Sequence, residues 1–269
     1  MIFNLSMPML KPKGPTASLT AQSGVTYTSG ISGLSAEKIR FYSEAISNNS
    51  NITNSTSVVY IDYGEEHYRI TVGDQVTLSL NGTDYAFDVI GFNHDDLTTS
   101  TAYGEETATG KAGITFQMHD LFATTYKMND GNSNYGGWKN SAMRTSTMAT
   151  MRGYMPSAWQ SIIKPVNKAS GTGGGSSSST ETVSDNCFLL AEIEIFGSTT
   201  RSVSGEGTQY AYYKAGNSKV KNKSGSVYTW WERSPRSGNR TDFCIVDVVG
   251  GANYYYAKTE GGVAFGFCV

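Results

Sequence analysis

The chain has 269 residues, a length that suits one large domain or one domain with an added module. Its formal net charge is −2 and only 16% of its residues are charged, so it offers no basic field to attract nucleic acid. Aromatic residues reach 12% and glycines number 30, but no apolar run approaches the roughly 20 residues of a membrane helix, which argues against membrane insertion.

The N-terminal segment has the composition of a linker. Residues 1–34 are rich in Pro, Gly, Ser and Thr, and we predict an arm that becomes ordered on a partner. Its first 13 residues, MIFNLSMPMLKPK, have no basic region ahead of their short apolar stretch, so no signal peptide is recognised. We expect residues 1–56, which add one helix to this arm, to serve attachment or oligomerisation.

One helix and a series of strands follow the arm. Residues 35–48 predict a short amphipathic helix, because Ser35 is a good N-cap and apolar residues recur along one side. That side consists of Ile39, Tyr42 and Ile46. From 57 to 92 apolar residues alternate as in strands, and Asn81-Gly82 between two alternating runs predicts a hairpin turn.

The middle of the chain predicts helices and its end predicts strands. We expect helices over 118–129, over 138–151 and from Pro156 onward, then a flexible surface loop over 170–180. Later apolar runs predict strands, beginning with CFLLAEIEIFG and QYAYYKAG. Strands, then helices, then strands indicate an α+β fold whose last hundred residues form an antiparallel meander.

Three consecutive tyrosines stand in the segment GGANYYYAKTEGG at 250–262. In a strand, Tyr254 and Tyr256 share one face and Tyr255 takes the other. We expect Tyr255 to turn inward and its two neighbours to contact a ligand. The alternative is that all three are ordinary strand residues packed within a sheet.

A set of motifs spread over residues 85–269 carries a family resemblance. The motifs are YAFDVIGFNHDD, GKAGITFQMHD, GGWKNSAMR, AEIEIFGST, GEGTQYAYY, VYTWWERSP, DFCIV and GGVAFGFCV. Together they resemble a domain of unknown function common in proteins of gut bacteria and their phages, over about residues 65–269. This domain looks like the C-type-lectin-like fold of formylglycine-generating-enzyme relatives. It also resembles the variable proteins of diversity-generating retroelements, which include phage receptor-binding tail proteins.

The resemblance implies a ligand-binding domain at 57–269 that contains fixed framework positions and variable ligand-binding positions. A fixed framework would comprise Trp230, Trp231, Ser234, Pro235, Phe243, Gly262, Val263, Phe265 and Phe267. A variable, ligand-binding segment at about 230–260 would present Glu232, Arg236, Asn239, Arg240, Asp242, Val246, Asp247, Val249, Ala252, Asn253, Tyr254, Tyr256 and Lys258. Tyr and Arg are residue types that dominate interface hot spots.

The function that follows is non-enzymatic receptor binding. The expected partner is a bacterial surface protein or glycan, and the expected location is a phage tail within a virion or a bacterial cell surface. Neither a cofactor nor nucleic acid is expected, and a homotrimer is the candidate assembly. A purely structural tail protein without a ligand is one alternative.

A second alternative is an oxidase of the formylglycine-generating type, since those enzymes use a pair of redox-active cysteines. This chain offers Cys244 and Cys268 on separate predicted strands. No basic residue or histidine lies near either cysteine in the sequence to lower its pKa. A structural role for both thiols, as for Cys187, is therefore the favoured interpretation.

Two His-Asp clusters are the remaining candidates for a metal-binding or catalytic site. His94-Asp95-Asp96 and His119-Asp120 combine imidazole and carboxylate ligands, so a metal site is chemically feasible. Their spacing fits no zinc or EF-hand pattern, and structural polar networks are the favoured interpretation over metal binding or catalysis. The Glu-Pro-Asn motif of calcium-dependent sugar-binding lectins is absent from the sequence.

Overall fold

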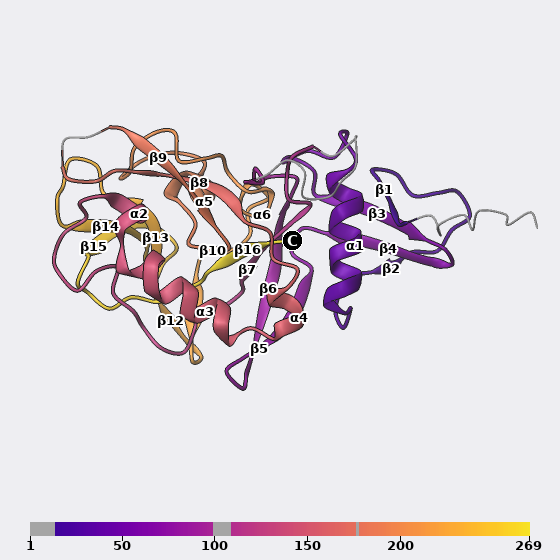
Figure 1. Cartoon of the computed structure of the whole chain (residues 1–269), viewed down its shortest axis with the longest axis horizontal. Coiled ribbons are helices and arrows are strands. Elements are labelled where there is room, and N and C mark those ends of the chain that lie inside the picture. Colours follow the sequence, from indigo (N-terminus) through magenta and orange to yellow (C-terminus); the bar gives the residue numbers. More distant parts are fainter. Residues whose placement is uncertain (1–13, 99–108, 176–177) are drawn as a thin grey trace, which may run out of the picture.

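The computed structural model describes residues 14–98, 109–175 and 178–269, and it has the α+β class that the sequence predicts. Mostly antiparallel sheets and short helices make up the molecule, which is elongated with a smaller N-terminal lobe at one end (Figure 1). No helix within those ranges combines the length and apolar character needed to cross a membrane.

The N-terminal lobe is a four-stranded sheet with one helix. Its strands are β1 (Thr16–Ser18), β2 (Thr28–Ser29), β3 (Val58–Tyr63) and β4 (Glu66–Thr71), in the order β1-β3-β4-β2. Residues 14–34, predicted to be an arm, therefore contribute two short strands, because backbone pairing to β3 and β4 orders them. The expected domain boundary at 56/57 falls inside this sheet, whose last strand ends at Thr71.

Helix α1 (Ala36–Ser47) confirms the amphipathic helix predicted from residue 35. The Ser35 hydroxyl accepts a hydrogen bond from the Lys38 amide, as an N-cap does. Its predicted apolar side is fully buried: Ile39, Tyr42 and Ile46 are each 0% exposed. Ser43 hydrogen-bonds the Val269 carbonyl, so this helix joins the N-terminal lobe to the larger lobe.

A five-stranded sheet lies next to α1, in the order β10-β16-β7-β6-β5. Its strands are β5 (Gln75–Leu80), β6 (Thr83–Phe92), β7 (Ile114–Met118), β10 (Cys187–Phe188) and β16 (Gly266–Cys268). The Asn81-Gly82 hairpin is confirmed, with φ of 49° and 84° at its two central residues. Positive φ at both positions gives the twist that suits a two-residue hairpin.

The predicted helix at 118–129 is wrong, because long-range hydrogen bonds hold that segment extended. The Phe122 amide donates to the Val263 carbonyl at 2.9 Å, and the Tyr126 amide donates to the Gly261 carbonyl at 3.0 Å. The apolar residues of this segment do point into the core, but the segment itself is extended and pairs with residues near the C-terminus. Sequence separation of more than 130 residues hides this pairing from a local pattern.

The helices that follow are shorter than predicted. They are α2 (Gly137–Asn140), a π-helical turn η1 (Met143–Thr147), α3 (Met148–Tyr154) and α4 (Ser157–Gln160). The helix expected over 138–151 is thus confirmed as three connected pieces. Pro156 caps α4, which confirms the expected helix start at that residue.

Two segments predicted to be strands are short helices, α5 (Glu192–Phe196) and α6 (Ala211–Lys214). The alternating sequence of α5 imitates a strand. Its glutamates instead accept backbone N–H groups, since Glu194 binds the Ala191 amide at 3.0 Å, and Gly197 ends the helix at a φ of 73°. Local capping therefore overrides the alternation.

The end of the molecule remote from α1 carries a three-stranded meander, the only part of the predicted hundred-residue meander that forms within the described residues (Figure 1). Strands β13 (Trp230–Pro235), β14 (Asp242–Val246) and β15 (Ala252–Tyr256) pair antiparallel in that order. The hairpins β8 (Val166–Gly171) with β9 (Thr180–Asp185) and β11 (Lys221–Lys223) with β12 (Ser226–Tyr228) complete the sheets. The predicted 170–180 loop is the β8–β9 connection. Strand β16 leaves the meander for the five-stranded sheet.

Candidate functional site: an aromatic and basic end surface

Strand β15 lies at the edge of its sheet and exposes tyrosines on both faces. Tyr256 is 56% exposed and Tyr255 is 38% exposed, so the prediction that Tyr255 turns inward is wrong. The physical reason is that Trp231 already fills the inner face. The Tyr255 ring meets the Trp231 ring edge-on, with centroids 6.3 Å apart, and therefore stays at the rim.

Tyr254 is half-buried beneath two arginines. The Arg236 guanidinium carbon lies 3.4 Å from the centroid of the Tyr254 ring, and that of Arg201 lies 5.5 Å away. Arg236 also forms an ion pair of 2.9 Å with Asp242 on the neighbouring strand. These contacts hold a cation over an aromatic face, an arrangement that contributes attraction and restricts both side chains.

Asn134 joins three loops at this end of the molecule. Its side-chain nitrogen donates to the carbonyl oxygens of Asn239 at 3.0 Å and Asp242 at 2.8 Å, and its side-chain oxygen accepts from the Gly174 amide. The next residue, Tyr135, is 79% exposed. These hydrogen bonds tie the three loops to one another beneath the exposed side chains.

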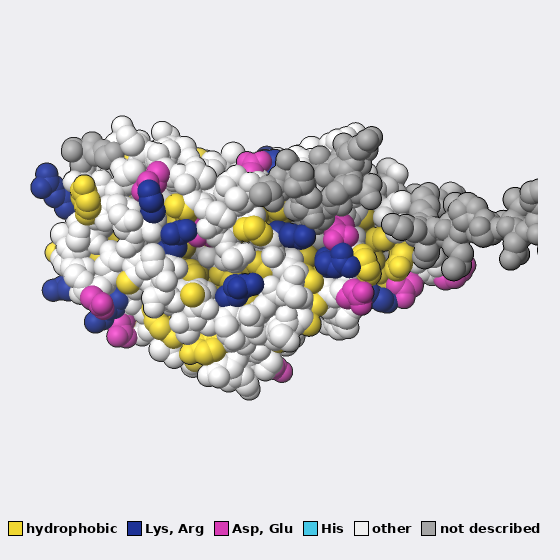
Figure 2. All heavy atoms as spheres, viewed as in Figure 1, with side chains coloured by type: hydrophobic (Ala, Val, Ile, Leu, Met, Phe, Trp, Pro, Cys, Tyr) yellow, Lys and Arg dark blue, Asp and Glu magenta, His cyan; other side chains and the backbone are white. Residues whose placement is uncertain are grey.

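We call the exposed and half-buried side chains around β15 the end surface. It consists of Tyr135, Arg201, Arg236, Arg240, Tyr254, Tyr255 and Tyr256. Basic and hydrophobic side chains project at this end of the molecule in Figure 2, at the left of the view, with acidic side chains beside them. Its composition matches that of adaptable protein surfaces, in which Tyr gives contact area at low entropic cost and Arg gives charge.

The residues predicted to bind ligand fall into three groups by exposure. Exposed are Arg240, Val249, Tyr256 and Lys258. Half-buried are Arg236, Asn239, Asp247, Ala252, Asn253 and Tyr254. Buried are Glu232, Asp242 and Val246. Ten of the 13 thus reach the surface around the last two strands of the meander, whereas the three buried ones are removed from contact with a ligand.

The buried members have interior roles. Val246 lies in the hydrophobic core, and Asp242 receives the Arg236 ion pair. Both carboxyl oxygens of Glu232 lack a hydrogen-bond partner among the described residues. Burial raises the pKa of Glu232 well above its ordinary value, helped by the nearby Glu192 and Glu206 carboxylates. The framework residues implied by the resemblance are all buried: Trp230, Trp231, Ser234, Pro235, Phe243, Gly262, Val263, Phe265 and Phe267.

A buried charge network supports β13 from beneath. Arg233 is 0% exposed and uses both terminal nitrogens to bind Glu194, at 2.5 and 2.8 Å. Its remaining N–H groups donate to the carbonyl oxygens of Ala169, Leu189 and Glu206. Every donor of this guanidinium is thus satisfied, which is the condition for a buried charge to be tolerated.

Lys168 extends the network to the His-Asp cluster. Its ammonium group binds Asp95 at 2.7 Å, Glu194 at 2.8 Å and the Tyr210 hydroxyl at 3.1 Å. Although burial acts to raise the pKa of Asp95, the Lys168 charge and the neighbouring His94 hold it well below its ordinary value. His94 stacks on Tyr210 with ring centroids 3.8 Å apart. These contacts support the structural interpretation of this cluster.

The two residues of the second His-Asp cluster, His119 and Asp120, have different partners. His119 faces Asp88 at 2.9 Å, and this hydrogen bond raises the pKa of His119. Asp120 instead accepts hydrogen bonds from the backbone and side chain of Asn222. Within residues 14–98, 109–175 and 178–269, no group of three or more His, Cys, Asp or Glu side chains has a metal-binding arrangement.

The cysteines in the described structure are free and buried. Burial raises the pKa of Cys187 to about 12 and raises those of Cys244 and Cys268 well above their ordinary value. Cys268 contacts Thr115 and Asp95. The pKa of Cys244 is raised further by nearby carboxyl groups, of which Glu232 has the largest effect. Such environments disfavour the thiolate that cysteine redox chemistry needs.

Sequence reasoning missed Tyr135, Arg201 and the anchoring Asn134. They come from segments 30 to 100 residues before the predicted variable segment. The only local signal was an aromatic residue inside the polar stretch NSNYGG at 132–137, which is typical of an exposed loop tip. Arg201 has no such signal, because only the fold brings it to Tyr254.

Comparison with known proteins adds one finding. No curated protein and no solved structure matches the chain. A family model described as a domain of unknown function (DUF6273) matches residues 112–269, which include α2, the helices after it, the meander and β16. Because this match covers more than half of the chain, the protein belongs to the DUF6273 family.

Proposed function

We propose that this protein is a non-enzymatic binding protein that contacts its ligand through the end surface. The observation that carries the proposal is the set of Tyr254, Tyr255 and Tyr256 at a sheet edge, with Arg236 stacked on the first of them. Tyr and Arg on a rigid support lose little entropy on binding, and these types dominate interface hot spots. The buried network around Arg233 supplies that rigidity.

The placement of the end surface also supports a binding role. It lies at the end of the molecule opposite the N-terminal lobe (Figure 1). A protein attached through its N-terminal lobe would therefore present the tyrosines outward. Attachment of several copies, such as a homotrimer, would raise a modest affinity per site through multivalency.

We infer the finer identity from the sequence resemblance. The larger lobe would be a C-type-lectin-like domain, and the protein would be a variable protein of a diversity-generating retroelement on a phage tail or cell surface. Its ligand would be a bacterial surface protein or glycan. Buried framework positions and mostly accessible variable positions are compatible with that proposal, since only accessible positions can vary without loss of the fold.

The test of the binding function is a glycan array combined with pull-down from bacterial surface extracts. The wild type is compared with a triple variant, Arg240→Ala, Tyr254→Ala and Tyr256→Ala. Its matched control carries Lys214→Ala and Val227→Ala, which change exposed residues away from the end surface. We expect the triple variant to lose the ligand and the control to retain it. Equal capture by all three proteins would place the site elsewhere.

A genomic observation tests the retroelement part separately. A near-identical repeat of the coding segment for about residues 230–269 should lie close to a reverse transcriptase gene. Its differences should fall at template adenines. If the neighbourhood holds no such repeat, the diversification proposal fails and the binding proposal stands on the pull-down alone.

A further inference from the structure

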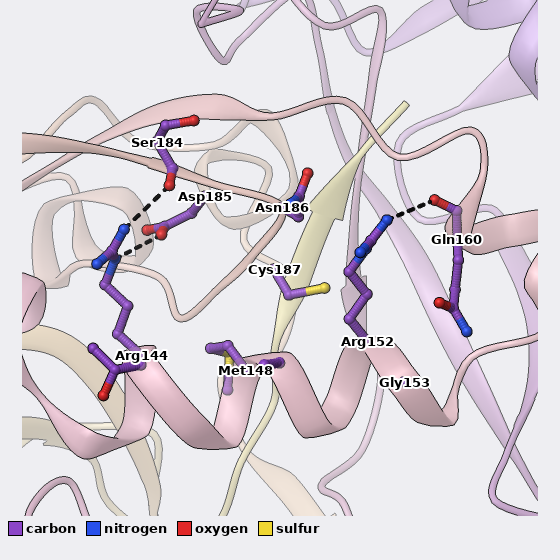
Figure 3. A pocket seen from close by; sticks show the side chains of 11 residues that line it. Arg144, Met148, Arg152, Gly153, Gln160, Ser184, Asp185, Asn186 and Cys187 are labelled. Atoms are coloured by element: carbon purple, nitrogen blue, oxygen red, sulfur yellow. Dashed lines mark hydrogen bonds and ion pairs between the residues drawn. The ribbon is translucent and has the colours of Figure 1, made fainter.

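A polar groove of about 490 Å³ lies along the helical segment, apart from the end surface (Figure 3). One wall is formed by η1 and α3, which contribute Arg144, Met148 and Arg152. The other wall is the end of β9 and the start of β10, residues 184–187, and Gln160 closes one end. Figure 3 shows the two arginines rising from the helix toward the second wall.

Arg144 is paired with the protein itself through three hydrogen bonds, one of them an ion pair. Its Nε donates to Asp185 at 2.7 Å, and its terminal nitrogens donate to the carbonyl oxygens of Lys139 and Ser184, both at 3.2 Å. The Asp185 carboxylate neutralises its charge. Arg144 therefore shapes the groove without attracting a further anion.

Arg152 differs, because its charge is uncompensated. Within the described part of the chain, its one hydrogen bond runs from Nη2 to the Gln160 carbonyl oxygen at 3.2 Å, and its buried Nε has no partner. Among the described residues, no carboxylate forms an ion pair with Arg152. A half-buried guanidinium with spare donors and no counter-charge is a receptor for a planar anion.

The surroundings of Arg152 define what kind of anion fits. The Asn186 side chain lines the groove and makes no hydrogen bond within the described part of the chain, so its amide is available to a ligand. Met148, Ala149 and Gly153 form an apolar floor. Apart from its chain neighbours, a Cβ added at Gly153 would meet no atom within 4 Å, so the groove is open at this residue.

We propose that this groove binds a small carboxylate that carries a short apolar substituent. The carboxylate would pair with the Arg152 guanidinium and accept a hydrogen bond from Asn186, while the substituent would lie on the apolar floor. One uncompensated cation matches a monoanion better than a phosphate dianion, and planar carboxylates fit a guanidinium edge. The carboxylate belongs either to a free organic acid or to the C-terminus of a peptide.

The experiment is calorimetric titration of the full chain with four compounds. They are N-acetyl-leucine, its amide, a tripeptide that ends in a leucine carboxylate, and inorganic phosphate. We expect both carboxylates to bind, and we expect the affinity of the amide to be lower by about tenfold or more. Tighter binding of the tripeptide assigns the groove to a peptide C-terminus, and equal binding assigns it to a small acid.

Variants locate the site within the groove. Arg152→Gln should lower carboxylate affinity about tenfold or more, and Asn186→Asp should do the same by placing a negative charge opposite Arg152. The matched control is Arg69→Gln, which removes an arginine from β4 in the N-terminal lobe and should leave affinity unchanged. Thermal unfolding checks that each variant is folded.

Three outcomes would overturn the proposal. The first is equal affinity for the acid and its amide, or binding of neither. The second is phosphate binding as tight as carboxylate binding. The third is unchanged affinity in a folded Arg152→Gln protein.

Discussion

Arg233 lies in β13 and Arg236 directly follows its last residue, Pro235, yet the two arginines occupy opposite environments. Arg233 is 0% exposed and has every donor satisfied by Glu194 and backbone carbonyls. Arg236 is half-buried, lies over the Tyr254 ring and pairs with the buried Asp242. The comparison separates the charges that hold the fold together from those presented at its surface.

This difference arises from how β13 is covered. All six of its residues are buried, so both faces of the strand lie against protein. Side-chain alternation therefore does not separate an inner face from an outer one, and the strand also carries an irregularity between Trp231 and Pro235. Exposure begins only where the strand ends, at Arg236.

The largest expected effect is on the interior side of the comparison. Arg233→Ala leaves Glu194 buried with one fewer counter-charge, so we expect a loss of about 3–5 kcal/mol in the free energy of unfolding. Urea denaturation measures it. A loss below about 1 kcal/mol, similar to that of a surface arginine, would remove the distinction between the two sites.

At Glu232, the residue before Arg233, we predict a substitution that increases the free energy of unfolding. Its carboxyl is buried without a hydrogen-bond partner among the described residues, and its pKa is raised in the folded state. Its destabilising effect is absent below the ordinary pKa near 4.5 and grows as the pH rises from there toward the folded-state pKa. We expect Glu232→Gln to stabilise the protein by about 1–3 kcal/mol at pH 7 relative to the wild type.

The pH dependence distinguishes this cause from a packing effect. The stability difference between Glu232→Gln and the wild type should shrink as the pH falls from 7 to 4, measured by urea denaturation at each pH. A difference that stays constant over this range would show that the Glu232 carboxyl carries no proton-linked penalty.

The smallest expected effect is on the surface side. Arg236→Ala removes one stacking contact and one ion pair to the buried Asp242, whose carboxylate keeps a hydrogen bond from the Thr241 hydroxyl, so we expect a loss of about 1–2 kcal/mol in the free energy of unfolding. The same urea denaturation that measures Arg233→Ala measures it. A loss comparable to that of Arg233→Ala would assign Arg236 to the support of the fold and not to its binding surface.

The parts of the fold that the sequence predicted are those set by neighbouring residues. The Ser35-capped helix and the Asn81-Gly82 hairpin are confirmed, because a cap and a turn depend on a few adjacent residues. The 118–129 helix and the strand expected at 192–196 are wrong, because contacts far along the chain or local capping decide them.

The candidate site shows the same limit. Arg240 and Tyr256, predicted to contact a ligand, are exposed, whereas Tyr255 and Glu232 take positions that depend on what covers each face of the sheet. Tyr135 and Arg201 join the end surface from distant segments, and no spacing rule connects them to β15. Tertiary covering, not periodicity, decides which side chains are accessible.

The central claim is that the end surface binds a ligand without supporting the fold. The most direct measurement is the affinity of the triple variant, Arg240→Ala, Tyr254→Ala and Tyr256→Ala, for the captured ligand, with its unfolding free energy measured in parallel. We predict an unfolding free energy within about 1–2 kcal/mol of the wild type and an affinity lowered about a hundredfold or more. Unchanged affinity in a stably folded triple variant would contradict the claim.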